Sequence, residues 1–586
     1  MKYRWDWVTP IAISPHDHNR VYVGAQVVFM TENAGQSWKV ISPDLTANNP
    51  EHEQNSGGIS SDNLVTYDGA TIYSIAESPV KAGVIWTGSD DGQVNVTKDG
   101  GAHWTNVTKN IPDLPAWGTV WNVEPSHFDA GTCYITVNLQ HVGIYDAHAY
   151  KTTDYGASWK LITASVPKSM NSSAHWITED PVRKGMLYLG VDNGLYISWD
   201  DGGHWTRLRS NLPPAPVYTV QIQPTFNDLV LATHGRGVFI LDDITPLREW
   251  DSAQNEDFHV FKPRSVYRFR NTDNAREADV GSHVTGENAP YGADINFHLA
   301  APEKNIEITV TKGAETIRTL KVDAHAGFNR VWWDLRYEPG SAIKMQVTPP
   351  DAPWAEVHRN YAAYGTRIPP AGPIVPPGNY TVRVKAGAHE ATVPLTVLPD
   401  PHSPGTEQSI HAQVQFAREV LAEENQAADM INHLEWTRRQ VEDLIGLLST
   451  AGNPNANGGA APNTHATNAN KFSAAISAAK DFEQKAIALE SQLIDVHNTG
   501  RSEDAFREPV QLYERISWMV GPMVGTPGSG SGGGDLAPTA QQIAVNEEFK
   551  QELARIQGEF KHFVEVETPA FNSVLKQNHV SAAIQP

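Results

Sequence analysis

The first 250 residues repeat one order of apolar and polar segments. Before Trp104 the chain reads YSIAESPVKAGVIWTGSDDGQVNVTKDGGAHW, and before Trp205 it reads WITEDPVRKGMLYLGVDNGLYISWDDGGHW. Each stretch has an apolar strand, a turn that contains proline, a second strand, an Asp-Gly or Asn-Gly turn and a third strand. Such dipeptides between apolar runs are strong hairpin signals. The pattern therefore predicts antiparallel meanders.

Five such units occupy roughly residues 5–248. The last unit, YTVQIQPTFNDLVLATHGRGVFILDD, is degenerate because it lacks the closing Gly and Trp. Meanders at this spacing are typical of a β-propeller with one unit per blade. We therefore expect residues 1–250 to form a partial propeller of about five four-stranded blades. The first strand of each unit is the candidate innermost strand.

The first four units end in an octapeptide of the form Ser/Thr-x-Asp-x-Gly-x-x-Trp. The Asp side chain can accept hydrogen bonds from turn amides, the Gly suits a positive φ, and the Trp can bury its ring against its blade. The first copy has Asn33 in place of Asp, and a turn tolerates this change whereas a catalytic carboxylate does not. We therefore expect a structural role for the octapeptide positions. These are Asn33, Gly35, Trp38, Asp99, Gly101, Trp104, Asp154, Gly156, Trp159, Asp200, Gly202 and Trp205.

The rest of the chain changes character twice, so that we expect a mainly β protein with an α-helical C-terminal part. Residues 251–400 contain short strands broken by Gly and Pro, which is typical of an Ig-like β-sandwich, and a Pro-rich insertion at 338–377 predicts a long loop. In residues 401–586 apolar side chains recur at steps of three and four, which predicts a helical bundle. Polar segments at 451–470 and 521–540 predict flexible linkers.

Composition restricts the classes of partner. The formal net charge of the 586 residues is −22, which disfavours nucleic acid because phosphate binding needs a basic face. The single cysteine, Cys133, excludes an intrachain disulfide and is expected to be a buried thiol. No apolar run is long enough to span a membrane, and no secretion signal is visible. No metal-ligand motif or phosphate loop occurs, so we expect neither a metal nor a cofactor.

The octapeptide resembles the Asp-box, or BNR repeat, which in that family is a structural turn on the outside of a β-propeller. The stretches IAISPHDHNRVYVGA, EDPVRKGMLYLGVDNGLYIS and DLVLATHGRGVFILDD also resemble a bacterial family of sortilin-like Asp-box proteins that are often labelled glycosyl hydrolases. The resemblance continues through GFNRVWWDLRY to the closing helices, and the Ig-like segment is similar to flagellar hook-capping Ig-like domains.

The resemblance also has implications for partners. Family members typically carry a secretion signal and an additional propeller half. The resemblance thus implies that a second chain or copy completes the propeller, and it leaves the compartment open.

Candidate chemistry lies on the expected inner strands. Aromatic residues recur there at Tyr73, Trp121, Trp176 and Tyr218, and glutamates recur near the strand ends at Glu77, Glu124 and Glu179. Aromatic faces beside carboxylates suit sugar stacking and acid/base work on a glycosidic bond, with Glu124 and Glu179 as the candidate pair. The same residues also suit packing between blades and turn capping.

The segment THGRG of the fifth unit contributes two further candidates. His234 and Arg236 lie between glycines at a hairpin and suit the binding of a carboxylate or phosphate, or the anchoring of the last blade. Two functions remain open on the sequence alone. The first is a peptide- or glycan-binding scaffold protein, and the alternative is a glycoside hydrolase that acts on a polysaccharide at the propeller centre.

Overall fold

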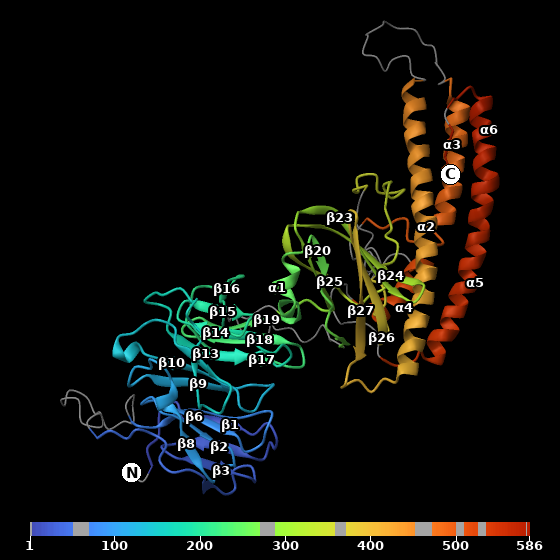
Figure 1. Cartoon of the computed structure of the whole chain (residues 1–586). Helices are drawn as coiled ribbons and strands as arrows, with labels where there is room; N and C mark the ends of the chain where they lie inside the picture. Colours follow the sequence, from blue (N-terminus) through green and yellow to red (C-terminus); the bar gives the residue numbers. More distant parts are fainter. Residues whose placement is uncertain are drawn as a thin grey trace. The chain divides into compact units, whose positions relative to one another are not determined.

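The chain forms two compact units, Met1–Asn255 and Glu256–Pro586. The computed structural model describes residues 3–50, 69–269, 288–357, 371–451, 471–499, 509–525, 535–581 and 583–585. The first unit is built almost entirely from strands, and the second combines sheets with long helices (Figure 1). The protein is therefore mainly β with a helical C-terminal part, as the sequence predicts.

The first unit consists of five antiparallel sheets in sequence order, each made from consecutive strands, and we call them blades 1 to 5. Blade 5 has three strands where four were expected, and its sequence lacks the closing octapeptide that follows the third strand of the other blades. A short helical segment, η3 (Thr245–Arg248) and α1 (Trp250–Ala253), ends the unit. The strands are β1 (Ile11–Ile13), β2 (Val21–Gly24), β3 (Val28–Thr31), β4 (Lys39–Val40), β5 (Ile72–Glu77), β6 (Ile85–Ser89), β7 (Val94–Thr97), β8 (Trp104–Asn106), β9 (Thr119–Pro125), β10 (Cys133–Asn138), β11 (Ala149–Thr152), β12 (Lys160–Leu161), β13 (Ala174–Glu179), β14 (Leu187–Val191), β15 (Gly194–Ser198), β16 (Thr206–Leu208), β17 (Val217–Gln223), β18 (Asp228–Thr233) and β19 (Gly237–Leu241).

The first strands of successive blades lie next to one another: β1 contacts β5, β5 contacts β9, β9 contacts β13, and β13 contacts β17. This arrangement confirms that the first strand of each blade is innermost, as in a partial β-propeller. Buried apolar clusters fill the space between consecutive blades. Hydroxyl groups add hydrogen bonds across these interfaces. Ser74 donates to the carbonyl of Val120 (2.8 Å) and Thr178 to the carbonyl of Val220 (2.9 Å).

The four octapeptide turns share one hydrogen-bond pattern. In the second copy the Thr97 hydroxyl donates to Asp99 (2.9 Å), Asp99 Oδ1 accepts from the backbone N–H of His103 (2.9 Å), and Thr97 Oγ1 accepts from the N–H of Gly101 (3.0 Å). The same bonds recur in the other three copies, with Asn33 as the acceptor in the first. The glycines have φ between +83° and +99°. This geometry supports the predicted structural role of the motif.

The tryptophans of the second, third and fourth octapeptides pack on the preceding blade, whereas the sequence led us to expect packing within their own blade. Trp104 and Trp205 each donate a hydrogen bond from Nε1 to a carbonyl one blade earlier, and the ring of Trp159 lies 6.0 Å from that of Trp86 in blade 2. Trp38 belongs to blade 1 and is 44% exposed. The octapeptides therefore join neighbouring blades as well as closing their own.

The second unit begins with a sandwich of two sheets around a shared apolar core. Trp333 is fully buried there and donates from Nε1 to the carbonyl of Arg336 (2.9 Å). One sheet has the order β20-β22-β25 and the other the order β21-β27-β26-β23-β24, in which β21 pairs in parallel with β27. The strands are β20 (Phe258–Val260), β21 (Val266–Arg268), β22 (Ala293–Leu299), β23 (Glu303–Lys312), β24 (Glu315–Ala324), β25 (Gly327–Trp333), β26 (Gly378–Ala386) and β27 (His389–Pro399).

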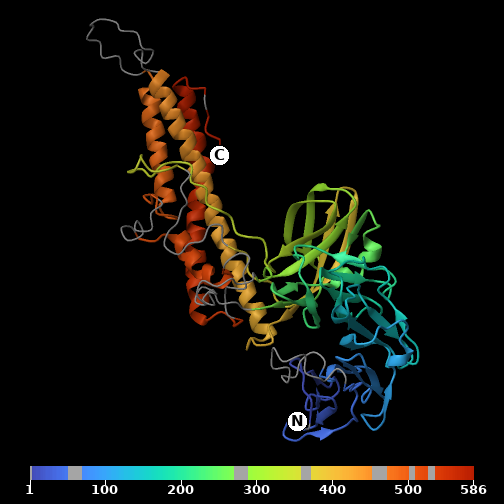
Figure 2. The ribbon, with the colours of Figure 1, turned by 90° about the vertical axis from the view of Figure 1, so that its left-hand side faces the viewer.

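The helices of the second unit share one apolar core, as an amphipathic pattern predicts. Figures 1 and 2 show the long helix α2 beside α3 and beside the column formed by α5 and α6. None of the helices in the described ranges combines the length and the apolar character needed to cross a bilayer. The helices are α2 (Glu407–Ala451), α3 (Ser473–Glu490), α4 (Leu512–Val524), α5 (Ala540–His562) and α6 (Thr568–Gln577), with a π-helical turn at Phe563–Glu567.

Residues 341–347 of the Pro-rich insertion lie along α2. Backbone N–H groups of Lys344 and Val347 donate to the side chains of Asn432 (2.6 Å) and Glu435 (3.0 Å), and Ile343 is buried in the helical core. This stretch has no regular secondary structure and is held by side chains of the helix. Residues 358–370 of the insertion lie outside the described residues, and so do 452–470 and 526–534 within the expected linkers.

A buried charged group joins α2 to α3. Arg438 donates from Nη1 to Glu490 (2.6 Å) and lies 3.6 Å from Glu435, and all three side chains are at most 2% exposed. Burial raises the pKa of Glu490. One cation thus stands between two buried carboxyl groups.

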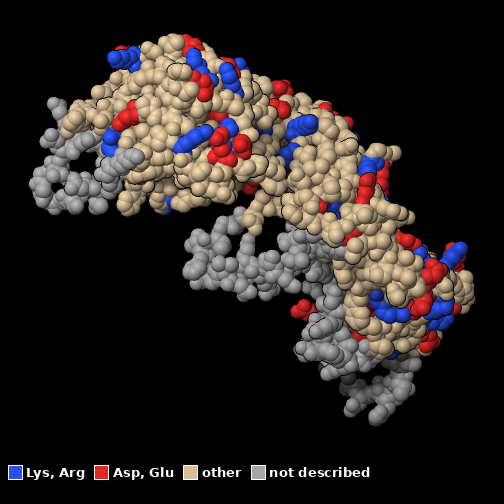
Figure 3. Space-filling view, turned by 90° about the horizontal axis from the view of Figure 1, so that it is seen from below, with Lys and Arg blue, Asp and Glu red and all other residues tan. Residues whose placement is uncertain are grey.

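On the face that Figure 3 shows, Lys and Arg are interspersed with Asp and Glu among the described residues.

Candidate functional site

The first unit contains a cavity of about 1130 Å³ where the inner strands meet. Its wall includes side chains from all five blades and from residues 6–8, which precede β1. Of the candidates from the sequence, Tyr73, Trp121, Trp176, Tyr218, Glu124 and His234 line it. The position suits a ligand site, because propellers bring loops and inner strands of several blades to one central space.

A β-bulge in each of four inner strands places one ring side chain toward the centre. Register shifts leave Tyr73, Trp121, His175 and Tyr218 each unpaired opposite the second strand of its blade. A bulge re-aims the extra residue and bends the strand. In blade 4 the bulged residue is His175, which is buried and does not line the cavity, whereas its neighbour Trp176, the candidate from the sequence, does line it.

The four bulged rings form one cluster. The centroid of Trp121 lies 5.1 Å from Tyr73, 4.9 Å from His175 and 5.3 Å from Tyr218, and His175 lies 4.2 Å from Tyr218. Trp121 meets His175 and Tyr218 at steep angles of 68° and 73°, which is a favourable geometry for aromatic rings. His175 is buried and its Nε2 lies 2.7 Å from Asp192 Oδ1. Trp176 lines the cavity and donates to Thr178 (3.0 Å).

A second set of polar residues lies at the end of the second strand in each of blades 2 to 5. The equivalent positions are Asp90, Asn138, Asp192 and His234, and the backbone N–H groups of Asp90, Asp192 and His234 each bond to the carbonyl of a residue just before the first strand. Asp90, Asn138 and His234 line the cavity. The sequence reading treated Asp90 and Asp192 only as turn residues, although their recurrence before each tight turn was a usable signal.

Two carboxyl groups of the cavity wall have raised pKa values. Asp90 is 5% exposed and accepts from the N–H (2.8 Å) and the hydroxyl (3.0 Å) of Thr71, and burial raises its pKa to about 7. Burial also raises the pKa of Glu124, whose carboxyl accepts from the N–H of Glu179 (3.2 Å) and lies 3.7 Å from His127. The cost of desolvating the charged form explains both shifts.

The three glutamates near the strand ends do not occupy equivalent positions. Glu77 and Glu179 each directly precede the residue that closes the turn to the second strand, and each accepts from the N–H six residues later, at 2.7 Å and 3.2 Å. In blade 3 Pro125 takes this position, so that Glu124 lies one residue earlier. Because side chains alternate along a strand, this shift turns Glu124 to the other face, toward the cavity.

Glu179 does not line the cavity. It is fully buried, and its carboxylate accepts hydrogen bonds from Ser126 (2.6 Å), the N–H of His127 (2.9 Å) and Tyr134 (3.3 Å) in addition to Gly185. These partners favour a structural role for Glu179. The catalytic role of Glu124 and Glu179 as a pair therefore stays a prediction, and only one of its two members reaches the cavity.

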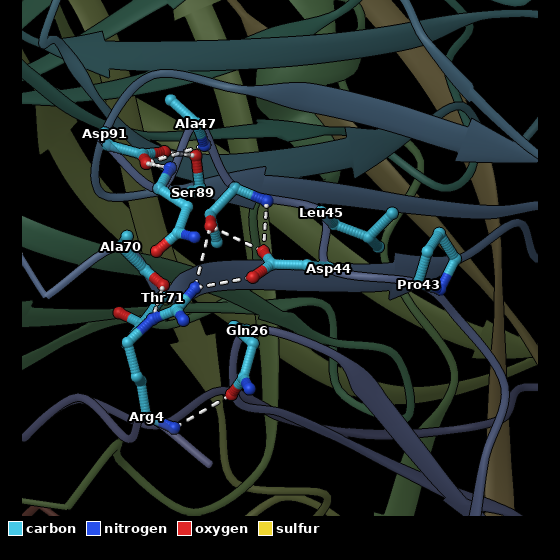
Figure 4. A network of polar contacts seen from close by, with 12 residues as sticks. Arg4, Gln26, Pro43, Asp44, Leu45, Ala47, Ala70, Thr71, Ser89 and Asp91 are labelled. Atoms are coloured by element: carbon cyan, nitrogen blue, oxygen red, sulfur yellow. Dashed lines mark hydrogen bonds and ion pairs between the residues drawn. The ribbon is translucent and has the colours of Figure 1, made fainter. Parts of the chain in front are cut away.

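Arg4 fixes the segment that carries Asp6 and Trp7 into the cavity wall. Its side chain donates to the carbonyl of Ala70 (3.0 Å) and to Asp44 (2.7 Å), and its backbone N–H donates to Gln26 (2.8 Å) (Figure 4). These bonds join the start of the chain to blade 1 and to the entry of blade 2. A half-buried cation beside several acceptors gives the segment a defined course.

The remaining candidates lie outside the cavity wall. Arg236 is exposed in the turn between β18 and β19, as the hairpin pattern predicts, and no octapeptide residue lines the cavity. Cys133 is buried and burial raises the pKa of its thiol, which disfavours a nucleophilic thiolate. Among the described residues, no group of three or more His, Cys, Asp or Glu side chains is placed to hold a metal ion.

Comparison with known proteins gives no family assignment. No family model matches the chain, and no curated protein sequence matches it. Among solved structures, similarity extends to YCF48 bound to a D1 peptide, at 17% identity over 41% of this chain and 65% of that one with a TM-score of 0.27. A GH74 xyloglucanase from Xanthomonas campestris is 13% identical over 65% of this chain and 62% of that one, with a TM-score of 0.31.

A third similar structure is the Cps50 (Swd1) β-propeller domain from Myceliophteria thermophila, at 9% identity over 54% of this chain and 87% of that one, with a TM-score of 0.29. The matched part is less than two thirds of the length of the first two proteins. Similarities at these TM-scores carry no conclusion about ligand or activity. The assignment of a partial β-propeller stands on the five sheets and their inner-strand contacts.

Proposed function

We propose that the first unit is a binding module that holds a peptide or a glycan in the central cavity, with the sandwich and the helices as a scaffold. The observation that carries the proposal is the cavity of about 1130 Å³, whose wall includes the aromatic side chains of Tyr73, Trp121, Trp176 and Tyr218. Ligand pockets of this size typically combine aromatic walls with a few placed polar groups. Both kinds of group are present, the polar ones at the ends of the second strands.

Trp121 is the residue that best tests this proposal, because its ring contacts three other members of the cluster. The experiment screens the full chain against arrays of peptides and of oligosaccharides and then measures affinity by calorimetry. Trp121→Ala is expected to weaken binding about tenfold or more. Trp354→Ala is the matched control, since it removes an 80% exposed tryptophan of the second unit. Equal affinity in both variants would place the ligand elsewhere.

A glycoside hydrolase that acts on a polysaccharide is the second candidate. The observation that favours it is the presence of two cavity carboxyl groups, Asp90 and Glu124, with raised pKa values, because a general acid near neutral pH needs such a shift. The test is turnover of chromogenic glycosides and polysaccharides. Turnover that disappears in Glu124→Gln, while the melting temperature is retained, supports the enzyme. Binding without any turnover supports the binding module.

We also propose that a second copy of the chain packs against exposed apolar side chains of the two terminal blades, 1 and 5, although those of blade 1, Ile11 and Ile13, also line the cavity. Ile11 and Ile13 of β1 are 69% and 64% exposed, and Val238 and Ile240 of β19 are 65% and 60% exposed. Within the unit, apolar faces of this kind are covered by the next blade. If blade 1 of one copy packs on blade 5 of the other, two identical interfaces close a two-fold ring.

The molecular mass of the full chain in solution tests whether a second copy binds. Sedimentation of the full chain is expected to give a dimer that Ile13→Glu and Val238→Glu each dissociate, because a buried carboxylate without a partner is unfavourable. Val80→Glu is the control, since Val80 is 46% exposed in the turn between β5 and β6 of blade 2. A wild-type monomer at all concentrations, or a dimer that survives both substitutions, would contradict the second-copy interface.

A further inference from the structure

The cavity has a one-sided charge. Three carboxyl groups line it, those of Asp6, Asp90 and Glu124, and no Lys or Arg is present among the described residues of its wall. The wall residues that can carry a positive charge are the imidazoles of His141 and His234. A concave wall with carboxylates and few cations focuses a negative potential into the cavity. That potential attracts cationic groups and repels anionic ones.

The aromatic side chains add a second attraction for a cation. A lysine ammonium or an arginine guanidinium within about 6 Å of a ring centroid is attracted by the electron-rich face of Trp or Tyr. Tyr73, Trp121 and Tyr218 are held together by their bulges, with centroids 5.1 Å and 5.3 Å apart on either side of Trp121. One bound group is therefore within reach of more than one ring.

The carboxyl groups come from different elements around the same space. Asp6 lies before β1 and accepts from the N–H of Val8 (2.6 Å), Asp90 follows β6, and Glu124 lies on β9. Asp6 is close enough to Asp90 to raise its pKa by like-charge repulsion. A cation placed among these groups relieves that repulsion, which is a favourable contribution absent for a neutral ligand.

We propose that the ligand of this cavity is a basic peptide segment, whose Lys or Arg side chain is held between the three carboxyl groups and the aromatic rings. The inference rests on the proposed binding function and names its ligand class. A neutral oligosaccharide uses the rings but gains nothing from the carboxylates, and an acidic peptide is repelled by them. The sugar alternative is therefore an outcome of the test.

The test uses the full chain at pH 8 and three sets of capped peptides of equal length with central Lys-Arg, Gln-Gln or Glu-Glu pairs, beside neutral oligosaccharides. Calorimetry is expected to detect the basic peptides alone, with affinity that falls as salt is raised. Glu124→Gln and Asp90→Asn are each expected to weaken binding about tenfold. Asn at position 90 keeps an acceptor for the N–H of Thr71, and melting temperatures verify the fold of both variants.

The matched control is Glu32→Gln, which removes one exposed carboxylate of the same unit that does not line the cavity. It is expected to leave the affinity unchanged. If neutral or acidic probes bind as well as basic ones and Trp121→Ala still abolishes binding, the charge inference is overturned and the binding function stands. If no probe of any charge binds, both are overturned.

Discussion

The indole Nε1 of Trp104 lies 2.9 Å from the carbonyl oxygen of Ile41, one blade earlier in the chain, and donates a hydrogen bond to it. Trp205 makes the same bond to Ile162 (2.6 Å). The same carbonyl oxygen restricts the octapeptide glycine. A Cβ added at Gly101 would lie 2.6 Å from the carbonyl oxygen of Ile41, which is too close. The octapeptides of blades 2 and 4 thus attach each of these blades to the one before it.

The first prediction concerns this contact between an octapeptide tryptophan and the preceding blade. Trp205 is 8% exposed and Trp38 is 44% exposed, so that removal of the two rings uncovers different amounts of buried surface. Trp205→Ala is expected to lower the free energy of unfolding by about 3–5 kcal/mol. Trp38→Ala is expected to cost less than about 1 kcal/mol in a monomer. Urea unfolding of the full chain, monitored by hydrogen exchange in blades 3 and 4, measures the difference in free energy of unfolding between the two variants. Equal losses of free energy of unfolding would contradict a stabilising role for the packing of Trp205 on the preceding blade.

The second prediction concerns the turn carboxylates. The N–H and the ring of His103 lower the pKa of Asp99 to about 2, against about 3.9 for an unfolded chain. A lowered pKa in the folded state means that the stabilisation is fully present above pH 4 and is lost as pH falls through 2. We expect Asp99→Ala to lower the melting temperature at pH 7. Asp99→Asn is expected to be close to wild type, because Asn33 fills the same role in the first turn. An unchanged melting temperature in Asp99→Ala would contradict the stabilising role of the Asp99 carboxylate in this turn.

The third prediction concerns Asp90. Burial, with repulsion from Asp91 and Asp6, raises its pKa to about 7, while bonds from Thr71 act in the opposite direction. Because the raised pKa keeps the group protonated below pH 7, its attraction for a basic peptide grows as pH rises through 7. Affinity is expected to increase about fivefold between pH 6 and pH 8.

Asp90→Asn supplies the check on this assignment. The variant is expected to bind weakly with little pH dependence, as calorimetry at several pH values will measure. The folded state of the wild type holds a proton that the unfolded chain has lost above pH 4, so that the free energy of unfolding falls as pH rises toward and through 7. The variant should lack this fall. An identical pH profile in both proteins would move the titration to another group.

The fourth prediction concerns the second unit. Arg438 neutralises Glu490 in a fully buried site, and its removal leaves two buried carboxyl groups, Glu490 and Glu435, without their cation. Arg438→Ala is expected to lower the free energy of unfolding of the second unit by about 3–5 kcal/mol. Arg439→Ala, next in the chain, removes an exposed pair with Asp443 and is expected to cost at most about 0.5 kcal/mol. Far-ultraviolet circular dichroism of the helices in urea compares them.

Local chemistry made much of the first unit predictable. The Asp-Gly and Asn-Gly turns, the octapeptides and the innermost position of the first strands all follow from residues near one another in the chain. The residues with long-range roles were less predictable. The sequence placed Glu124 beside Glu179 as a pair, yet Pro125 takes in blade 3 the position that Glu179 takes in blade 4. Glu124 therefore faces the cavity, while Glu179 lies in a buried hydrogen-bond network.

The sequence by itself determined the number of meanders, their turns and the change from strands to helices, because each is specified by contacts between near neighbours. Only the tertiary structure decided which side chains meet at the centre. A bulge adds one residue and thereby exchanges the two faces of a strand, which is how His175 joins the rings of Trp121 and Tyr218 while Trp176 lines the cavity. The partners of Trp104 and Asp90 likewise depend on how whole blades pack, and periodicity along one strand carries no record of that packing.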